Sequence, residues 1–586
     1  MTALDWTIVV VYLAGCTAAG LWMRRYVRNV DDFAVAAREM EVNLGVASLA
    51  ATEVGIVTVM YTAEMGFKHG LAGATTGVLT ALAMLLVGLT GFVIVPLRNA
   101  RVMTIPELFE KRFGKRVRWL AGLVVILGGV LNMGVFLRAG GDFLMHVTGM
   151  DTAASFTVPG TGWQIGYLQL IMTALLAIVL AYTVLGGMLS VLITDYLQFL
   201  VMGAGIVVTS VLVLRSAGWT ELPARLWDRH QKAVLYGPPE PAKLQEIGRR
   251  YEALAQAAEP HQARQQWEAV VRPLAEQGTL IGTSPPRPGH PPETPKIFRL
   301  SHPFDPTRNE GMGWGYVIWQ AITALAVVTT WQTTIARVLA ARDAHTAKRV
   351  YRGTWFYFVG RWCLPGLWGV GALLYFAAQG GLEPGTSSNT AMPRFLHTVL
   401  SGTYGFMGLV IAAMLAAEMS TDSGYLLTWA TVIYNDLICP CLRRPLPERA
   451  RLLIIRLVVL AIGLFLMFWG LWYEPPGSIW DYLAITGNIY LASLFAMLVG
   501  ALYWRKANSW GAVSAIVLGA VGPITFLIVN FFHPEGTPGH IPAEVSGLCA
   551  FALAFFGMFA GSLLGNALGT GRGAQPSDMR IEEHQP

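Results

Sequence analysis

Charged residues are scarce in this chain. Of its 586 residues only 13% are charged, whereas 54% are hydrophobic and 63 are glycine. A soluble globular protein of this composition would expose a large apolar surface to water. The scarcity of charge therefore argues against a water-soluble protein and predicts a polytopic membrane protein.

Cysteines are also few, and they are scattered. The five are Cys16, Cys363, Cys439, Cys441 and Cys549. Only Cys439 and Cys441 are close in sequence, and no metal-ligand partners lie near them. We therefore expect inert or reduced thiols and no disulfide framework.

Catalytic motifs are missing as well. The sequence has no His–Cys cluster, no metal-ligand spacing and no nucleophile motif, so we predict no enzyme and no catalytic residue. The formal net charge is +6. Because the basic residues gather in loops between apolar segments, this charge indicates membrane topology and gives no basis for nucleic-acid binding.

Apolar segments long enough to cross a bilayer are abundant. Windows of about 20 apolar residues, matched to the thickness of the hydrocarbon layer, give roughly thirteen predicted transmembrane helices in an all-α protein. They start near Leu4, Leu44, Thr76, Trp119, Ile165, Leu189, Gly315, Thr354, Tyr404, Leu452, Ile479, Gly511 and Val545.

The short loops between these segments carry the Lys and Arg residues that set orientation. Counting spans places all the basic loops on one face, which the positive-inside rule makes cytoplasmic. The amino terminus is then outside and the carboxyl terminus cytoplasmic, an arrangement consistent with a bacterial inner membrane. The residues that lead to this prediction are Arg24, Arg25, Arg28, Arg98 to Arg118, Arg342, Lys348, Arg349, Arg352, Arg443, Arg444, Arg449, Arg451, Arg505 and Lys506.

One part of the chain does not have the composition of a membrane-spanning segment. The stretch from Trp219 to Gly311 is polar and rich in proline, and the topology places it outside. Leu244, Ile247 and Tyr251 recur at helical spacing, and a second apolar stripe begins at Trp267. We expect a small helical hairpin with Pro-rich flanks. It either caps the structure or captures a solute or a partner.

The segment from Gly408 to Asp436 is apolar but interrupted by polar side chains. Hydrocarbon cannot solvate hydroxyls or carboxylates, so these side chains should face protein or a water-filled path. Such a cluster predicts an ion site. Its members are Glu418, Ser420, Thr421, Asp422 and Ser423.

Four segments carry a resemblance to a known family. They are MTIPELFEKRFGKRVR from Met103, TVLGGMLSVLITDYLQFLVMG from Thr183, WQTTIARVLAARDAHTAKR from Trp331, and STDSGYLLTWATVIYNDL from Ser420. Together, and in this order, they resemble the sodium:solute symporter family, which includes sodium/sugar, sodium/proline and sodium/sialic acid carriers. The resemblance covers nearly all the chain except the outer insertion.

The resemblance implies a leucine-transporter-type fold, in which two five-helix repeats are related by an inverted 5+5 arrangement. In this sequence the parts are an additional first helix and loop (1–43), the first repeat (44–214), the extracytoplasmic insertion (215–312), the second repeat (313–502), two further helices (503–569) and a cytoplasmic tail (570–586).

The resemblance also implies a sodium site near the bilayer midplane. Its ligands map to the carbonyl oxygens of Ala51, Val54 and Ala417 and to the hydroxyls of Ser420 and Thr421. Five uncharged oxygens suit a hard monovalent cation that must later be released. Sodium is the only metal that we expect.

Asp195 has two interpretations. It matches a family aspartate that helps to hold a second sodium in some members. Alternatively it lies at the cytoplasmic start of a helix and accepts hydrogen bonds from backbone N–H groups there.

Glu53 and Arg138 are charged residues in apolar segments, which is costly without a partner. Glu53 could tune cation affinity, accept a proton or bind a cationic substrate group. Arg138 could bind a substrate carboxylate, or the two residues could pair with each other. Glu418 and Asp422 bracket the hydroxyl pair. The family more often has a small or apolar residue at Glu418, which leaves proton coupling or a structural role open.

The substrate is less well defined by the sequence. Sugar carriers of the family have an Asn and a Tyr where this chain has Ala324 and Val327. The lining therefore favours a small carboxylate or amino acid over a sugar. Thr58, Thr330 and Gln332 are candidate substrate contacts, although threonines in membrane helices often bond their own backbone.

The resemblance implies sodium-coupled symport by alternating access, with a small solute and the lipid bilayer as partners. The alternative is a transporter-like sensor that works with a separate signalling partner.

Overall fold

The structure is a computed structural model of the 586-residue chain. It describes residues 1–569 and 571 except for 151–154, 158, 160–163, 256–259, 284–294, 443, 445, 473–478 and 534–536. The Pro-rich stretch predicted to follow Thr283 lies almost entirely outside the described residues, and so does most of the carboxyl-terminal tail.

Helices dominate the described chain. Those before the insertion are α1 (Ala3–Met23), α2 (Val30–Val35), α3 (Val42–Glu53), α4 (Ile56–His69), α5 (Thr75–Thr90), α6 (Ile94–Asn99), α7 (Ile105–Phe113), α8 (Lys115–Thr148) and α9 (Tyr167–Ala217). Those after it are α13 (Gly313–Thr330), α14 (Gln332–Ala340), α15 (Ala344–Ala378), α16 (Ser388–Leu400), α17 (Phe406–Val432), α18 (Glu448–Trp472), α19 (Ile479–Tyr503), α20 (Ser509–Phe532) and α21 (Ala543–Ala567).

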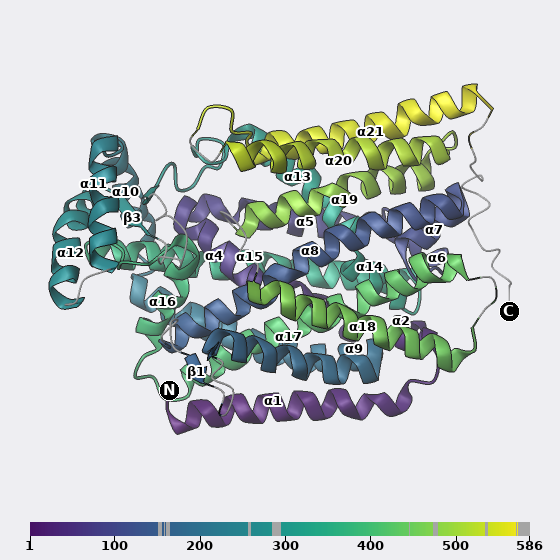
Figure 1. Cartoon of the computed structure of the whole chain (residues 1–586), viewed down its shortest axis with the longest axis horizontal. Coiled ribbons are helices and arrows are strands. Elements are labelled where there is room, and N and C mark those ends of the chain that lie inside the picture. The colour runs from purple at the N-terminus through teal and green to yellow at the C-terminus, as the bar shows by residue number, and fades with distance from the viewer. Residues whose placement is uncertain are drawn as a thin grey trace.

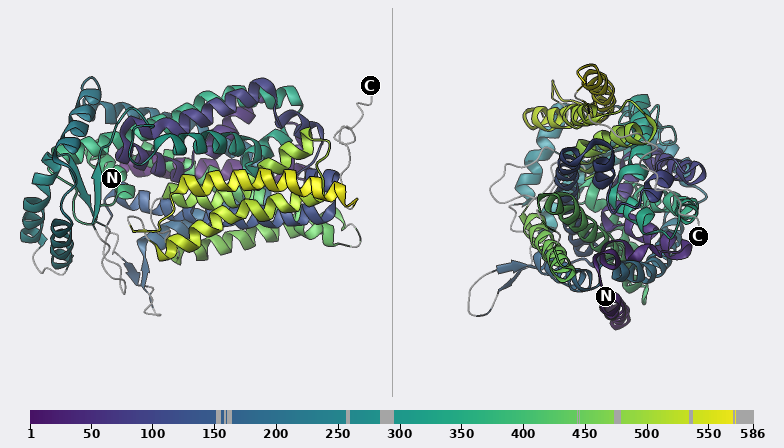
Figure 2. Two further views of the ribbon diagram at one scale, coloured as in Figure 1. Left: turned by 90° about the horizontal axis from the view of Figure 1, so that it is seen from above. Right: turned by 90° about the vertical axis from the view of Figure 1, so that its right-hand side faces the viewer.

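The long helices lie side by side in one bundle (Figure 1). In the end-on view α1 lies at one edge of the bundle, and α20 and α21 lie at the opposite edge (Figure 2). α17 runs through the centre, and almost every residue from Met407 to Val432 is buried. The most polar of the membrane-length segments is therefore also the most enclosed.

Nine helical segments among the described residues are long and apolar enough to cross a membrane, and the bent pair α13–α14 makes a tenth. Thirteen were predicted, and that number is not confirmed. One reason for the difference is that α9 contains 51 residues, with non-helical backbone at Gly187, and includes the two predicted spans that start near Ile165 and Leu189. The 35-residue α15 is absent from the ten although it contains the predicted start Thr354.

Besides the non-helical residue in α9, two helix pairs meet at breaks inside the bundle. α3 ends at Glu53 and α4 begins at Ile56, with Val54 in a non-helical conformation between them. α13 and α14 are separated by Trp331, whose backbone is extended, and their axes differ by 42°. Each break removes intrahelical hydrogen bonds and leaves backbone carbonyls free to bind other groups.

The insertion forms a small separate body at one end of the bundle (Figure 1). It contains α10 (Leu222–Tyr236), α11 (Pro241–Ala255), α12 (Pro260–Glu276) and the antiparallel strands β3 (Thr279–Gly282) and β4 (Lys296–Arg299). Another antiparallel pair, β1 (Ser155–Thr157) and β2 (Gln164–Gly166), precedes α9. The insertion has its own apolar core, made by Ile247, Tyr251, Trp267, Val271, Leu274 and Ile281.

Hydrogen bonds connect the insertion to the backbone directly before α16. The indole N–H of Trp267 donates to the carbonyl oxygen of Leu382 at 2.9 Å. The N–H of Gly385 donates to the Thr283 hydroxyl at 2.8 Å, and the N–H of Thr283 donates to the carbonyl oxygen of Thr386 at 3.1 Å. The insertion and the segment before α16 are thus held together by backbone and buried side-chain bonds.

Candidate functional site

The break between α3 and α4 lies against the hydroxyl pair of α17. The Ser420 hydroxyl donates to the carbonyl oxygen of Ala51 at 2.9 Å and also contacts that of Ala417 at 3.0 Å. Thr421 donates to the carbonyl oxygen of Thr52 at 2.9 Å. Four of the five predicted sodium ligands therefore belong to one cluster of neutral oxygens.

Gly55 allows this close approach. A methyl group on Gly55 would lie 2.6 Å from the Thr421 hydroxyl, which is closer than real side-chain carbons come. The fifth predicted ligand, Val54, is buried and directly precedes Gly55. The sequence missed the carbonyl of Thr52, because only the geometry of the break shows which carbonyl faces Thr421.

Asp195 lies two turns after the non-helical residue Gly187 of α9, and its partners among the described residues are side chains and not backbone N–H groups, so the helix-start alternative is wrong. One of its carboxylate oxygens accepts hydrogen bonds from the hydroxyls of Ser48 at 2.5 Å and Thr52 at 3.2 Å. Arg337 of α14 contacts the same oxygen at 3.2 Å, and both side chains of this ion pair are fully buried. The other oxygen, Oδ1, has no hydrogen-bond partner within the described part of the chain.

Arg337 was not singled out from the sequence. It also donates to the Thr52 hydroxyl at 2.5 Å, so one guanidinium joins α14, α3 and α9. A signal was present, since Arg337 stands in the motif from Trp331 and an arginine in an apolar segment needs a partner. The identity of that partner depends on packing between segments far apart in sequence.

Glu53 pairs with Arg361 of α15, not with Arg138. The distance between the carboxylate and the guanidinium is 3.1 Å, and both side chains are at least nine-tenths buried. The Thr334 hydroxyl donates to the second carboxylate oxygen at 2.6 Å. Arg138 instead pairs with Asp142, one turn along α8, at 3.4 Å. The predicted Glu53–Arg138 pair is therefore wrong, because α15 and not α8 faces the end of α3.

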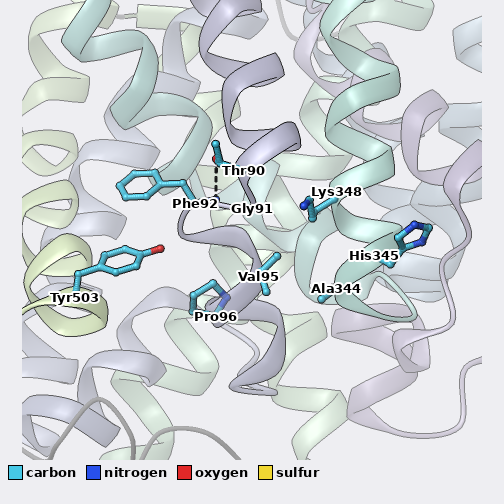
Figure 3. A pocket seen from close by; sticks show the side chains of 9 residues that line it. All are labelled: Thr90, Gly91, Phe92, Val95, Pro96, Ala344, His345, Lys348 and Tyr503. Carbon is cyan, nitrogen blue, oxygen red and sulfur yellow. Dashed lines mark hydrogen bonds between the residues drawn. The ribbon is translucent and has the colours of Figure 1, made fainter.

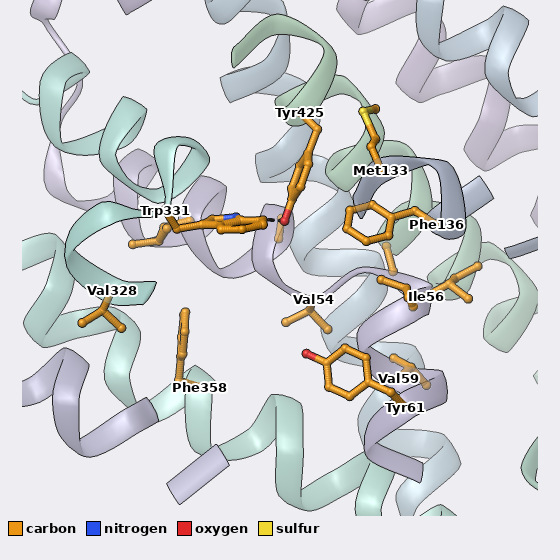
Figure 4. Packing of buried hydrophobic residues seen from close by; sticks show 14 of the residues in the cluster. Val54, Ile56, Val59, Tyr61, Met133, Phe136, Val328, Trp331, Phe358 and Tyr425 are labelled. Atoms are coloured by element: carbon orange, nitrogen blue, oxygen red, sulfur yellow. Dashed lines mark hydrogen bonds between the residues drawn. The ribbon is translucent and has the colours of Figure 1, made fainter. Parts of the chain in front are cut away.

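Aromatic side chains surround the same region (Figure 4). Trp331, at the break between α13 and α14, donates its indole N–H to the Tyr425 hydroxyl at 2.9 Å. Tyr425 packs edge-on against Phe136, with ring centroids 5.1 Å apart. Arg361 also donates to the Tyr61 hydroxyl at 3.4 Å. Both helix breaks thus meet within one aromatic-lined region of the bundle.

The three polar residues predicted to contact substrate have bonds of their own. Thr58 donates to the carbonyl oxygen of Glu53 at 3.3 Å, and Thr330 donates to that of Ala326 in its own helix at 2.7 Å. Gln332 accepts a bond from the backbone N–H of Ile105 at 3.3 Å. In this conformation the two threonine hydroxyls bond nearby backbone, and Gln332 connects α14 to α7.

Glu418 and Asp422 are both buried in α17, four residues apart. A methyl group on Gly140 would lie 2.9 Å from the carboxyl carbon of Glu418, so this carboxyl group lies directly against α8. Within the described part of the chain, neither oxygen of Glu418 nor Oδ2 of Asp422 has a hydrogen-bond partner.

The family assignment rests on most of the chain. The profile of the Sodium:solute symporter family matches residues 33–233 and 297–519. The chain belongs to the sodium:solute symporter family. The two matched regions include both helix breaks and the whole of α17. The unmatched interval between them falls within the insertion.

Two curated relatives are similar to this symporter over nearly its full length. The sodium/mannose cotransporter SLC5A10 of Bos taurus is 27% identical over 571 residues, which span 92% of this chain and 81% of the relative. Sodium/glucose cotransporter 1 of Oryctolagus cuniculus is 24% identical, with 93% and 75% of the two chains aligned.

Two solved structures share the fold. A substrate-bound, outward-open Na+-coupled sialic acid symporter matches with a TM-score of 0.68 at 16% identity, covering 98% of this chain and 99% of that one. Mhp1, a nucleobase-cation-symport-1 family transporter, matches with a TM-score of 0.51 at 11% identity, covering 92% and 96%.

Family membership defines the general class of this protein. It is an integral membrane transporter, and its relatives are sodium-coupled cotransporters, which are not enzymes. The family indicates sodium as the coupling ion and a small molecule as the transported solute.

Proposed function

We propose that this protein imports a small organic carboxylate or amino acid together with sodium, by alternating access. Sodium is one of its two substrates, and both bind near the two helix breaks. A membrane potential of about 100 mV contributes about 2.3 kcal/mol for each charge moved inward, which corresponds to roughly fiftyfold accumulation for one sodium. No covalent chemistry is required.

The proposal for sodium rests on the contact between α17 and the helix break that follows α3. Ser420 and Thr421 bring two hydroxyls to within 2.9 Å of carbonyl oxygens of α3. Neutral oxygens at a helix break are the donor set that a monovalent cation requires. In our proposal the carbonyls of Ala51, Val54 and Ala417 complete the site, and the ion holds α3 against α17.

Replacing a hydroxyl should weaken sodium binding selectively. Ser420→Ala and Thr421→Ala should each raise the sodium concentration for half-maximal uptake by about tenfold or more, since a hydrogen-bond-scale contact to a charge is worth about 1.5–3 kcal/mol. Thr431→Ala is the matched control, because Thr431 is also on α17 but donates to its own backbone, at Leu427. Equal effects at all three positions would contradict the site.

Asp195 is a candidate ligand for a second sodium. Its Oδ1 atom is buried and free of hydrogen-bond partners among the described residues, while Arg337 balances the charge on Oδ2. A carboxylate with one oxygen committed and one available suits a weakly held cation.

The Glu53–Arg361 pair supports an acidic or zwitterionic solute. The Nε atom of Arg361 is buried without a hydrogen-bond partner in the described residues, so the guanidinium has a donor available for a carboxylate. Glu53 offers the opposite charge to a substrate amine. We therefore propose Arg361 as a substrate contact in addition to Glu53. Thr58, Arg138, Thr330 and Gln332 stay predicted substrate contacts.

The order of the helices supports the inverted repeat. A broken pair begins each half, α3–α4 and α13–α14, and a further helix follows each pair, α5 and α15 respectively. The short helices α7 and α16 occupy corresponding places before α8 and α17. We propose thirteen crossings, with repeats at 44–214 and 313–502 flanked by 1–43, the insertion 215–312, the helices 503–569 and the tail 570–586.

Orientation follows from the basic loops. We propose that the end of the bundle with the insertion faces outward and that the carboxyl terminus is cytoplasmic, in a bacterial inner membrane. The amino terminus lies near the insertion end, and the carboxyl-terminal end of α21 lies at the other (Figure 1).

Uptake into liposomes tests the whole proposal. Labelled amino acids, carboxylates and sugars are offered with an inward sodium gradient, an inward proton gradient, or neither. We expect accumulation of an acidic or zwitterionic solute only with the sodium gradient. Equal uptake driven by protons without sodium would contradict the coupling ion, and binding without flux would favour a sensor.

A further inference from the structure

A hollow of about 570 Å³ lies between the end of α5, the start of α6, the start of α15 and the end of α19 (Figure 3). It is lined mainly by apolar groups, and one wall carries Lys348 and His345. None of the residues that we assign to sodium or solute lines it. The orientation proposed above places it at the cytoplasmic surface of the bilayer.

The turn between α5 and α6, which contributes Gly91 and Phe92 to the hollow, is strained at the next residue. Val93 has a φ of +62°, in the left-handed region that a β-branched residue rarely adopts. The Val93 N–H donates to the Tyr503 hydroxyl at 3.0 Å, which fixes this turn to α19. Strained backbone persists only where its surroundings enforce it, and it is concentrated at functional sites. The contact with Tyr503 therefore holds this turn in its strained conformation beside the hollow.

One wall is aromatic and faces the lipid. Phe92 and Tyr503 stack with ring centroids 5.3 Å apart and an interplanar angle of 7°. Tyr503 is half-exposed, and so are Leu86 and Leu89 on the adjoining turn of α5. Aromatic rings above exposed leucines are typical of the boundary between acyl chains and headgroups.

The opposite wall is basic. The Lys348 side chain crosses Gly91, where an added methyl group would lie 3.4 Å from its Cδ atom. Lys348 has no ion pair within the described residues. Asp343, the acidic N-cap of α15, accepts a hydrogen bond from the Thr346 N–H at 2.6 Å and pairs with Arg342 at 3.6 Å. Its charge also acts on His345, so Lys348 is the basic group of this wall that needs an anion. Positive side chains in the first turns of a helix are unfavourable unless an anion is close.

We propose that this hollow binds one anionic phospholipid. The phosphate of this lipid lies between Lys348 and His345. The glycerol region of the lipid packs on the Phe92–Tyr503 pair, and one acyl chain lies along Leu86 and Leu89. A free anion would not use the aromatic wall and the exposed leucines, whereas a zwitterionic lipid would gain little from the basic wall. A basic pocket between helices at the cytoplasmic side matches the known chemistry of anionic headgroup recognition.

Lipid retention by the purified full-length protein tests this site. The protein is incubated with mixed phosphatidylglycerol and phosphatidylcholine, delipidated gradually, and its bound lipid is counted by native mass spectrometry. We expect wild type to retain phosphatidylglycerol preferentially and Lys348→Gln to retain about fivefold less, the effect expected for one basic residue near a membrane surface. Lys348→Arg should retain it as wild type does.

Arg449→Gln is the matched control, because it removes the same charge from an exposed residue of α18 outside the hollow. It should retain phosphatidylglycerol as wild type does. Equal losses in Lys348→Gln and Arg449→Gln would overturn the site, since they would indicate general surface attraction. Equal retention of both lipids by wild-type protein would also overturn it, and this measurement requires no variant to fold.

Discussion

Buried carboxylates occur in two different settings in this symporter. Asp195 and Glu53 each face a guanidinium, at 3.2 and 3.1 Å respectively. Glu418 and Asp422, on the continuous helix α17, face no such partner among the described residues. The first setting balances charge between helices that meet at the breaks. The second leaves two buried carboxyl groups without a balancing positive charge in the described part of the chain, and the Glu418 carboxyl group lies against α8, whereas Ser420 and Thr421 contact α3.

Breaking the more deeply buried pair should have the largest effect. Asp195→Asn leaves Arg337 uncompensated in a fully buried position, so we expect a loss of about 3–5 kcal/mol in the free energy of unfolding. Thermal unfolding of the purified protein, followed by tryptophan fluorescence, measures the change. The double variant Asp195→Asn/Arg337→Gln should recover part of the loss. A double variant that is less stable by the sum of the single effects would show that the two side chains do not interact.

The second pair should show a smaller loss of stability together with a transport effect. Glu53→Gln keeps a hydrogen-bond acceptor for Thr334 but leaves the charge of Arg361 without its partner. Because Arg361 is slightly exposed, we expect a loss of about 2–3 kcal/mol in the free energy of unfolding. We also expect a higher KM for the solute at unchanged sodium affinity. Solute titrations in liposomes at saturating sodium measure this KM. An unchanged KM would remove Glu53 from the substrate site.

Replacing a carboxyl group that has no ion-pair partner among the described residues should not lower the free energy of unfolding as breaking an ion pair does. Glu418→Gln breaks no ion pair, so its effect on the free energy of unfolding should stay within about 1 kcal/mol or be stabilising. Sodium affinity should change less than in Ser420→Ala or Thr421→Ala, because Glu418 lies against α8 and the two hydroxyls contact α3. Sodium titrations of uptake and thermal unfolding test the two parts separately. A destabilisation as large as that of Asp195→Asn would abolish the contrast between the settings.

An exposed ion pair on the surface of the insertion should give the smallest change in the free energy of unfolding. Lys232 and Asp228 form an ion pair at 2.8 Å, but their side chains are 47% and 61% exposed. Lys232→Gln should change the free energy of unfolding by less than about 1 kcal/mol, because water screens the pair. High salt should leave this variant and wild type indistinguishable in the same unfolding measurement.

Local motifs made one part of the site predictable. The hydroxyls of Ser420 and Thr421 interrupt an apolar run, and Gly55 interrupts another, so the sequence alone brought attention to both segments. In the structure the Ser420 hydroxyl contacts the carbonyl oxygen of Ala51, and both atoms belong to the predicted ligand set. The partners of Glu53 and Asp195 were not predictable in this way. Arg361 and Arg337 are 308 and 142 residues distant from them, and no local pattern selects one arginine among many.

Long helices made the fold only partly predictable. Hydropathy located most of the apolar segments, since each predicted start lies in or near a helix. It separated the two spans that start near Ile165 and Leu189, and the non-helical residue Gly187 of α9 lies between them. The pairing of helices within the bundle depends on packing at small residues such as Gly55 and Gly140, which carry no signal in hydropathy.

The bonds between the insertion and the backbone before α16 have a practical consequence. Trp267 and Thr283 fasten a solvent-facing body to a segment that leads into the bundle. An antibody fragment that binds α11 and α12 would therefore also restrain α16 without contacting the membrane region. Such a fragment would serve as a handle for arresting single conformations, and as a rigid fiducial for imaging a protein that otherwise offers little surface outside lipid.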